Sequence, residues 1–293
     1  MRCSRPACFQ TASADTKGCL KTPFHRSDGL FRRPPPAHNE TMFTDTHAHL
    51  ADPQLAAKLP AVLAQAAAAG VTRFFVPATG RGDWQNVLAL AAPAVVPAIG
   101  IHPWFADSHD AANVDQLDAL LRRHPHALVG EAGLDYRHAA DDAARQTQRA
   151  ILSAQLDLAA QHGRAVLLHN VRAGADLLRL LQKHGIRRGA VHAFSGSLEE
   201  AQAFIRQGLK IGIGSLLLNP AARKACRAAA ELPLTALVLE TDSPFMLKDA
   251  ANTPANIRTI AQTVCTLRGI GLAELSAATE NNATQLTESP KAV

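Results

Sequence analysis

The stretch that decides the fold is Phe43-Thr44-Asp45-Thr46-His47-Ala48-His49. Its phenylalanine and threonines favour an extended strand. The first strand of a dinucleotide-binding sheet continues into a Gly-x-Gly-x-x-Gly turn, whereas this one ends in two histidines. Because side chains two apart on a strand share a face, His47 and His49 can point to the same side. We therefore expect a strand that carries metal ligands at its carboxyl end.

Beyond this stretch, short apolar segments alternate with longer Ala- and Leu-rich segments, which is typical of a parallel sheet wrapped in helices. The eight predicted strands are Phe43–His49, Thr72–Ala78, Val95–His102, Ala127–Gly133, Ala165–His169, Gly189–Phe194, Leu209–Gly214 and Ala236–Thr241. Eight strand–helix units in about 250 residues match the usual size of a (β/α)8 TIM barrel. An open doubly wound sheet is the alternative architecture.

The helices are predicted between these strands and after the last one. They span Pro53–Ala69, Gln85–Ala92, Asp115–His124, Asp141–His162, Gly174–His184, Leu198–Gln207, Pro220–Ala230 and Asn256–Arg268, with a final helical segment after Gly271. Several of them are followed directly by a glycine, as helix ends commonly are.

Residues 1–41 differ in composition from the rest of the chain. They contain three consecutive prolines and no continuous apolar region, which argues against a helix and against a secretory signal. We expect a single barrel domain over residues 42–293 that begins at Met42, with residues 1–41 a disordered extension or a misassigned start. An organellar transit peptide is the less favoured alternative.

The formal net charge of +5 invites a nucleic-acid interpretation, but the charge is unevenly distributed. Seven basic and three acidic residues lie in the first 41 positions, which leaves 23 basic and 22 acidic residues in the barrel. Only 4% of residues are aromatic, which argues against a surface that stacks nucleobases. Cys226 and Cys265 form no disulfide framework, so we expect a reducing, cytoplasmic location. The sequence contains no apolar run of about 18 residues, so we expect no membrane span.

Residues able to bind a metal end five of the predicted strands, and barrel enzymes build their active sites at these ends. Each residue alone could be a helix cap or a hydrogen-bonded structural histidine, but their coincidence on five strands favours a metal centre. Imidazoles with carboxylates suit Mg²⁺, Mn²⁺ or Zn²⁺. The six predicted ligands are His47, His49, Glu131, His169, His192 and Asp242.

Six ligands exceed the needs of one tetrahedral site. We therefore expect two divalent cations that share Glu131, activate a water and clamp the oxygens of the substrate. Asp242 is placed to take the proton of that water. Glu131 and Asp242 are accordingly the predicted catalytic residues of a hydrolase.

Five motifs resemble those of the TatD family of metal-dependent hydrolases in the amidohydrolase superfamily. They occur in order and at matching intervals between Met42 and about Leu286, as Asp45-Thr46-His47-Ala48-His49, Gly100-Ile101-His102-Pro103, Gly130-Glu131-Ala132-Gly133-Leu134-Asp135-Tyr136, His192-Ala193-Phe194-Ser195-Gly196 and Glu240-Thr241-Asp242-Ser243-Pro244. The resemblance implies a (β/α)8 barrel, a divalent-metal site and deoxyribonuclease or related phosphodiester hydrolysis. It also implies the same six ligands.

Two further residues are predicted to bind substrate. His102 lies in the Gly-x-His-Pro turn, where it either approaches the metals or structures the loop. Arg137 is the cation closest in sequence to a ligand-bearing strand end.

The chain departs from the family pattern at two places that bear on substrate. His169 is followed by Asn170-Val171-Arg172 where the family usually has Ser-Arg, and the loop Phe245–Asn252 keeps only Lys248 where the family loop is basic. Because polynucleotide affinity depends on neutralising several phosphates, we expect nucleic-acid ends or small phosphodiesters as substrates. We expect no membrane partner and no obligate protein partner.

The leading hypothesis is a 3′-to-5′ exonuclease of DNA. The same metal chemistry would also serve hydrolysis of an ester or amide, such as an aminoacyl-tRNA ester or a small metabolite. A non-catalytic nucleic-acid-binding protein that uses residues 1–41 as an arm, or a protein that senses or stores metal, are hypotheses from other classes.

Overall fold

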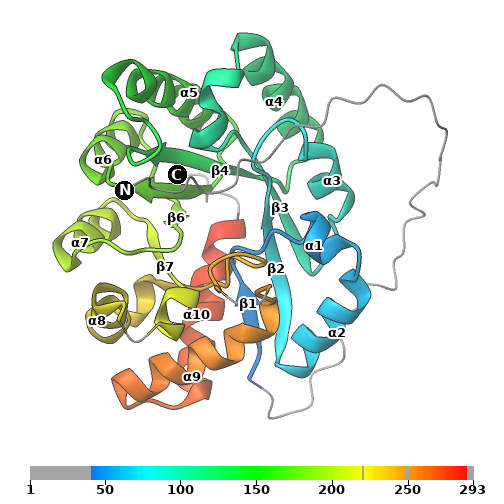
Figure 1. Ribbon diagram of the computed structural model, residues 1–293, viewed down its shortest axis with the longest axis vertical. Coiled ribbons are helices and arrows are strands. Elements are labelled where there is room, and N and C mark those ends of the chain that lie inside the picture. The colour runs from blue at the N-terminus through cyan, green and yellow to red at the C-terminus, as the bar shows by residue number, and fades with distance from the viewer. Residues whose placement is uncertain (1–40, 220, 249–250, 289–293) are drawn as a thin grey trace, which may run out of the picture.

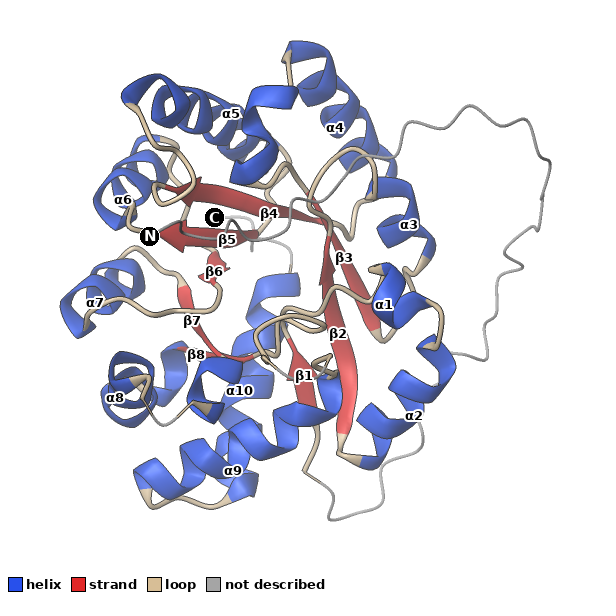
Figure 2. Ribbon diagram, viewed as in Figure 1, coloured by secondary structure: helices blue, strands red, loops and turns tan. Residues whose placement is uncertain are grey.

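The computed structural model describes residues 41–219, 221–248 and 251–288. Eight parallel strands are hydrogen-bonded in sequence order, from β1 to β8. Figure 2 shows them at the centre of the molecule with helices around them. The strands are β1 Phe43–Asp45, β2 Val71–Pro77, β3 Val95–Ile99, β4 Leu128–Asp135, β5 Val166–Val171, β6 Gly189–Val191, β7 Lys210–Ile213 and β8 Leu237–Leu239.

The last strand returns to the first and nearly closes the barrel. The backbone N–H of Thr46 donates to the carbonyl of Leu239 over 2.9 Å. Beyond the strands, Ala48 and Ser243 form a parallel bridge. The predicted (β/α)8 barrel is therefore confirmed, and the open doubly wound alternative is excluded because β1 and β8 lie side by side.

Helices follow the strands and surround the sheet (Figure 1). Several begin at side-chain caps, such as Asp141, whose carboxylate accepts the N–H of Ala144 at the start of α5. The α-helices are α1 Pro53–Ala56, α2 Leu59–Ala68, α3 Trp84–Ala89, α4 Ala111–Arg123, α5 Asp142–Gln161, α6 Gly174–Lys183, α7 Leu198–Arg206, α8 Arg223–Glu231, α9 Ile257–Arg268 and α10 Leu272–Thr287. The short 3₁₀ helices are η1 Pro103–Ser108, η2 Ser215–Leu218, η3 Leu234–Ala236 and η4 Pro254–Asn256.

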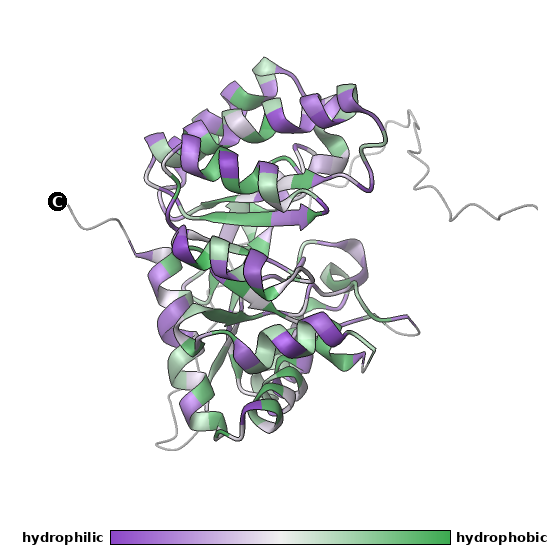
Figure 3. Cartoon of the chain, turned by 90° about the vertical axis from the view of Figure 1, so that its left-hand side faces the viewer, coloured by the Kyte–Doolittle hydropathy of each residue, from purple (hydrophilic) through white to green (hydrophobic). Residues whose placement is uncertain are grey.

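Apolar side chains fill the space on both sides of the strands. One cluster joins strand residues such as Phe75, Leu167 and Val238 to Ala283 and Leu286 of α10. A larger cluster packs the strands against the surrounding helices. Figure 3 shows the resulting contrast, with mostly hydrophobic strands inside helices of mixed hydropathy. Burial of these side chains supplies the main driving force for closing the barrel.

Most predicted strands extend beyond the observed ones at their carboxyl ends. The first was predicted to reach His49 but ends at Asp45, and the third was predicted to reach His102 but ends at Ile99. The extra residues, among them His47, His49 and His102, lie instead in the segments that follow the strands. The helix predicted over Pro53–Ala69 is also interrupted between α1 and α2, where Lys58 has a non-helical backbone.

The extension predicted over residues 1–41 lies, except for Thr41, outside the described residues. Among the described residues, Met42 is fixed to the barrel, since its carbonyl accepts a 2.6 Å hydrogen bond from Ser276. No helix in the described ranges is long and apolar enough to cross a membrane.

Candidate metal centre

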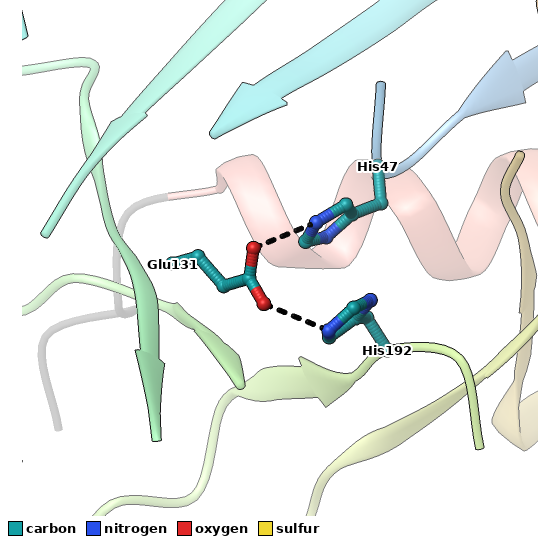
Figure 4. A group of neighbouring side chains, drawn as sticks. All are labelled: His47, Glu131 and His192. Atoms are coloured by element: carbon teal, nitrogen blue, oxygen red, sulfur yellow. Dashed lines mark hydrogen bonds and ion pairs between the residues drawn. The ribbon is translucent and has the colours of Figure 1, made fainter. Parts of the chain in front are cut away.

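The carboxylate of Glu131 lies at the centre of the candidate site (Figure 4). Its Oε2 atom is 3.2 Å from Nε2 of His47 and 3.6 Å from Nε2 of His49. Its Oε1 atom is 2.8 Å from Nε2 of His192 and 3.0 Å from Nδ1 of His169. Each oxygen of one buried carboxylate therefore faces its own set of imidazoles.

The local structure of β4 and β5 brings Glu131 and His169 together. Gly133 pairs directly with His169 in the parallel ladder. It has φ 152°, and a Cβ atom there would lie 2.0 Å from the carbonyl oxygen of His169. Only glycine therefore allows the two strands to approach at this point.

The joined ends of β1 and β8 supply the rest of the site. Oδ1 of Asp242 lies 3.3 Å from Nε2 of His49 and 3.7 Å from Nε2 of His47. Asp242 adopts a left-handed backbone conformation with φ 57°, so the backbone at this residue departs from the extended conformation of a strand. Its N–H donates to the carbonyl of His47 over 2.8 Å, so the two loops hold each other in place.

The structure thus brings all six predicted ligands together. We call them the donor cluster. Together with the neighbouring His102, the cluster forms three overlapping groups whose potential ligand atoms lie within 4.8 Å of one another, namely His47/Glu131/His192, His47/His49/Asp242 and His102/Glu131/His169.

The residues present fit divalent cations. Glu131 is buried and Asp242 is largely so, yet in the described part of the chain neither forms an ion pair with a lysine or arginine. Buried carboxylates are normally paired with a cationic side chain or with a metal. Imidazole and carboxylate donors suit Mg²⁺, Mn²⁺ and Zn²⁺, and no cysteine takes part.

The electrostatics of the cluster keep its carboxylates ionised. Burial alone would raise the pKa of Glu131, but the positive charges of His192 and His102 lower that pKa well below its usual range. Burial would likewise raise the pKa of Asp242, but the hydrogen bond with His49 and the positive charges of the neighbouring histidines together lower it. Ionised carboxylates are the form that binds cations.

The histidines of the cluster differ in charge. Burial lowers the pKa of His47 to about 4, which leaves its imidazole neutral and able to donate a lone pair. Burial would also lower the pKa of His192, but the charge and hydrogen bond of Glu131, together with the charges of Asp242 and Glu240, raise it to about 10. Glu131 therefore stabilises positive charge beside it, which is what a bound divalent cation supplies.

The two residues predicted to bind substrate lie in different environments. His102 is buried beside the donor cluster, with Nε2 3.3 Å from Oε1 of Glu131, and its Nδ1 accepts the N–H of Trp104 at the start of η1. His102 thus has both of the positions considered for it, since it caps η1 and also lies close to the cluster. Arg137 is exposed just beyond β4, and its guanidinium forms no hydrogen bond or ion pair with the described residues.

Three buried acidic residues around the cluster received no role from the sequence. Oδ2 of Asp135 lies 3.2 Å from Nε2 of His169. Both carboxylate oxygens of Asp45 bind Thr241, which joins the ends of β1 and β8. Glu240 accepts the N–H of Ala193 over 2.5 Å and so fixes the backbone directly after His192.

A signal for these three residues was present, because all of them occur within the quoted motifs. The sequence could not indicate that these residues support the predicted ligands, by contacting them or the backbone beside them. Burial raises the pKa of Asp45 to about 7 and that of Glu240 to about 8. Burial would also raise the pKa of Asp135, but its hydrogen bonds with His169 and Trp104 lower it.

A cavity of about 390 Å³ lies between the loops that follow β2 and β3, and none of the six donors lines it. Its walls include Arg81, His109 and Phe105. Phe105 also contacts the ring of His102, with the ring centroids 6.3 Å apart. One wall residue of the cavity therefore contacts His102, which lies beside the donor cluster.

A family model described as "TatD related DNase" matches residues 44–288. This chain belongs to the TatD-related DNase family. The resemblance found in the motifs is thus confirmed, and with it a hydrolytic enzyme.

Relatives within the TatD family match this chain over nearly their whole length. The chain is 37% identical to the uncharacterized metal-dependent hydrolase YjjV of Escherichia coli, over 85% of this chain and 98% of that one. It is 33% identical to the 3′-5′ ssDNA/RNA exonuclease TatD of Edwardsiella piscicida, over 83% and 98%. The crystal structure of Escherichia coli YjjV superposes with a TM-score of 0.78 at 35% identity, over 85% and 98%. The chain thus resembles this TatD homologue in its fold as well as in its sequence.

Proposed function

We propose that this chain is a divalent-metal-dependent deoxyribonuclease that removes nucleotides from the 3′ end of single-stranded DNA. The observation that carries the proposal is the placement of Glu131, whose two carboxylate oxygens face separate sets of imidazoles. One carboxylate shared between two groups of donors suits a pair of divalent cations. The exonuclease named among the relatives supports the direction and substrate.

Two cations held in this cluster would supply Lewis acidity to activate a water and to neutralise the charge of the phosphate oxygens. His47, His49 and Asp242 would hold one of them, and His169 and His192 the other, with Glu131 shared. His102 is close enough to Glu131 to support the second group.

Asp242 is proposed as the general base. Its lowered pKa keeps the carboxylate ionised, and its side chain is more exposed than that of Glu131, so it can reach a water at the mouth of the site. A carboxylate that accepts the proton of the attacking water allows attack near neutral pH. Glu131, in contrast, is enclosed by imidazoles, and its role would be to hold the two cations in place.

The test is turnover of a 3′-labelled single-stranded oligodeoxynucleotide with Mg²⁺, Mn²⁺ or Zn²⁺. The His47→Ala/His49→Ala variant is the control, because it removes two donors from the same group. We expect metal-dependent release of mononucleotides that the double variant abolishes. Release that persists in the double variant would show a contaminating nuclease, and cleavage of an ester or amide panel in its place would overturn the proposal.

Arg137 is proposed to bind the substrate phosphate next to the cluster. We expect Arg137→Ala to raise KM by about 5-fold with little change in kcat, since an exposed charged contact contributes modestly to binding. Arg187→Ala is the matched control, because Arg187 precedes β6 and lies at the opposite end of the strands. Unchanged kinetics in Arg137→Ala would remove this role.

We place the whole activity in residues 42–293 and in a reducing, cytoplasmic environment, since Cys226 and Cys265 are both free thiols. A chain that starts at Met42 contains every proposed ligand. It should turn over the oligonucleotide as fast as the full chain does, whereas a basic arm in residues 1–41 would make the shorter chain bind more weakly at low salt.

A further inference from the structure

Exposed aromatic side chains gather around the donor cluster. Among the described residues, the exposed large hydrophobic side chains are Trp104 (46%), Phe105 (44%), Met246 (39%), Phe245 (38%) and Leu267 (41%). Four of these five lie in two loops, one after β3 and the other after β8. The chain is poor in aromatic residues as a whole, but this average conceals where they lie.

Each loop places an aromatic ring directly against the histidines of the centre. The ring of Phe245 contacts that of His49, with centroids 5.4 Å apart. The ring of Trp104 lies edge to face with His102 at 5.1 Å and approaches His169 at 6.5 Å. His49 faces one oxygen of Glu131, and His169 faces the other. The two rings therefore flank the two ends of the donor cluster.

The ring of Trp104 is held in a fixed orientation. Its Nε1 atom donates to Oδ2 of Asp135 over 2.8 Å, and its backbone N–H donates to Nδ1 of His102. One face stacks on the ring of His138, with centroids 5.5 Å apart and an interplanar angle of 23°. A fixed ring that remains nearly half exposed can stack with a planar group at little cost in conformational entropy.

Few positively charged side chains lie near the donor cluster to bind the phosphates of a substrate. Lys248, Arg137 and Arg172 are exposed near the rim, and Arg81 lines the cavity beside Phe105. With so few charges to bind phosphates, a substrate that is a single strand must be held in another way. Every nucleobase has a π-face, and stacking on aromatic side chains binds single strands without reading their sequence.

We propose that Trp104 and Phe245 are stacking platforms for the two bases that flank the scissile phosphodiester at the end of single-stranded DNA. This inference rests on the proposed function and names the part of the substrate that the enzyme recognises. The cations held by Glu131 and the imidazoles around it would bind the phosphate, and the rings on either side would position the nucleosides.

The first test compares two 3′ ends. One oligodeoxynucleotide carries normal bases at its last two positions, and the other carries tetrahydrofuran abasic residues there. We expect the wild type to favour the normal end in kcat/KM by about 10- to 100-fold, from stacking of two bases. Phe245→Ala should reduce this preference by about 10-fold, mainly through KM, because the Phe245 side chain makes no hydrogen bond.

Trp104 needs a pair of variants, because its ring also binds Asp135. Trp104→Phe keeps a ring and should retain most of the preference, whereas Trp104→Ala should lose about 10-fold of it. Leu267→Ala is the matched control, since Leu267 is equally exposed but lies on α9, away from the two loops. It should preserve the wild-type preference.

The second test is fluorescence and requires no turnover. Trp84 and Trp104 are the two tryptophans of the chain, and Trp84 is only 2% exposed. A hydrolysis-resistant phosphorothioate oligothymidylate should quench the emission of Trp104, and Trp104→Phe should abolish the quenching. An abasic strand of the same length should not quench.

The outcomes separate the two proposals. Equal kcat/KM for the normal and abasic ends, together with Trp104 emission that the oligonucleotide does not quench, would overturn the proposed platforms. The deoxyribonuclease proposal would remain. Absence of turnover with every metal would overturn the deoxyribonuclease, and quenching would then still decide whether the platforms bind bases.

Discussion

Asp135 connects the rim of the site to its interior. Its Oδ2 atom binds both His169 and the indole of Trp104, while Oδ1 accepts the backbone N–H groups of Arg137 and His138. A carboxylate behind a ligand histidine fixes the orientation of the ring and strengthens it as a donor. One side chain thus positions a proposed ligand and a proposed substrate platform together.

Replacing Asp135 should therefore weaken the metal centre. We expect Asp135→Asn to reduce metal affinity or kcat by about 10- to 100-fold, because the amide is uncharged and can no longer accept at both oxygens. Titration calorimetry with Mn²⁺ measures the affinity. Asp118→Asn is the matched control, since Asp118 also binds a histidine, His162, over 2.6 Å but on the helical exterior. Equal losses in both variants would contradict the prediction.

At the scale of elements, the approach of β4 to β5 is the most demanding contact in the site. Gly133→Ala would place a Cβ atom against the backbone of His169 and impose a strained φ. We expect it to lower the free energy of unfolding by at least about 1–3 kcal/mol, measured by urea denaturation, and to impair metal binding. Gly82→Ala should be nearly neutral, since nothing lies within 4 Å of a Cβ atom there. A stable, metal-binding Gly133→Ala protein would show that the strands can separate at little cost.

The alternation of strands and helices was predictable because burial imposes a pattern that a single sequence displays. The six donors were predictable for a related reason, since the carboxyl ends of parallel strands must meet at one rim. What the sequence could not show is the backbone that leaves each strand. The left-handed conformations of Ala193 and Asp242 depend on contacts with distant residues such as Glu240 and His47.

The aromatic platforms were missed for a different reason. The aromatic content of the chain is an average over every residue, and it cannot reveal that Trp104 and Phe245, 141 positions apart in sequence, lie beside the same cluster. The buried Asp135 and Glu240 were likewise visible as residues but not as supports. Both failures concern contacts between distant segments rather than local pattern.

At the scale of the whole molecule, the metals should stabilise the fold. The proposed ligands come from five strand ends, so a cation bound to them favours the closed barrel over the unfolded chain. At a concentration of 100 times Kd the gain is about 2.7 kcal/mol, which corresponds to a rise in Tm of about 5–10 °C for a chain of this size.

Differential scanning calorimetry before and after chelation with EDTA measures this effect. Addition of Mn²⁺ should restore the higher Tm, and the His47→Ala/His49→Ala variant should respond much less. A chelator-insensitive Tm in the wild type would indicate that the cluster binds no cation tightly.

The closure between β1 and β8 has a consequence for synthesis on the ribosome. Asp45 and Thr241 hydrogen-bond across 196 positions of sequence, and the same closure brings His47 and His49 to Asp242. A nascent chain carries its first histidines long before their acidic partner has been translated. A product that stops short of residue 242 can therefore assemble only part of the centre, so hydrolysis at this centre can begin only once the polypeptide is essentially complete.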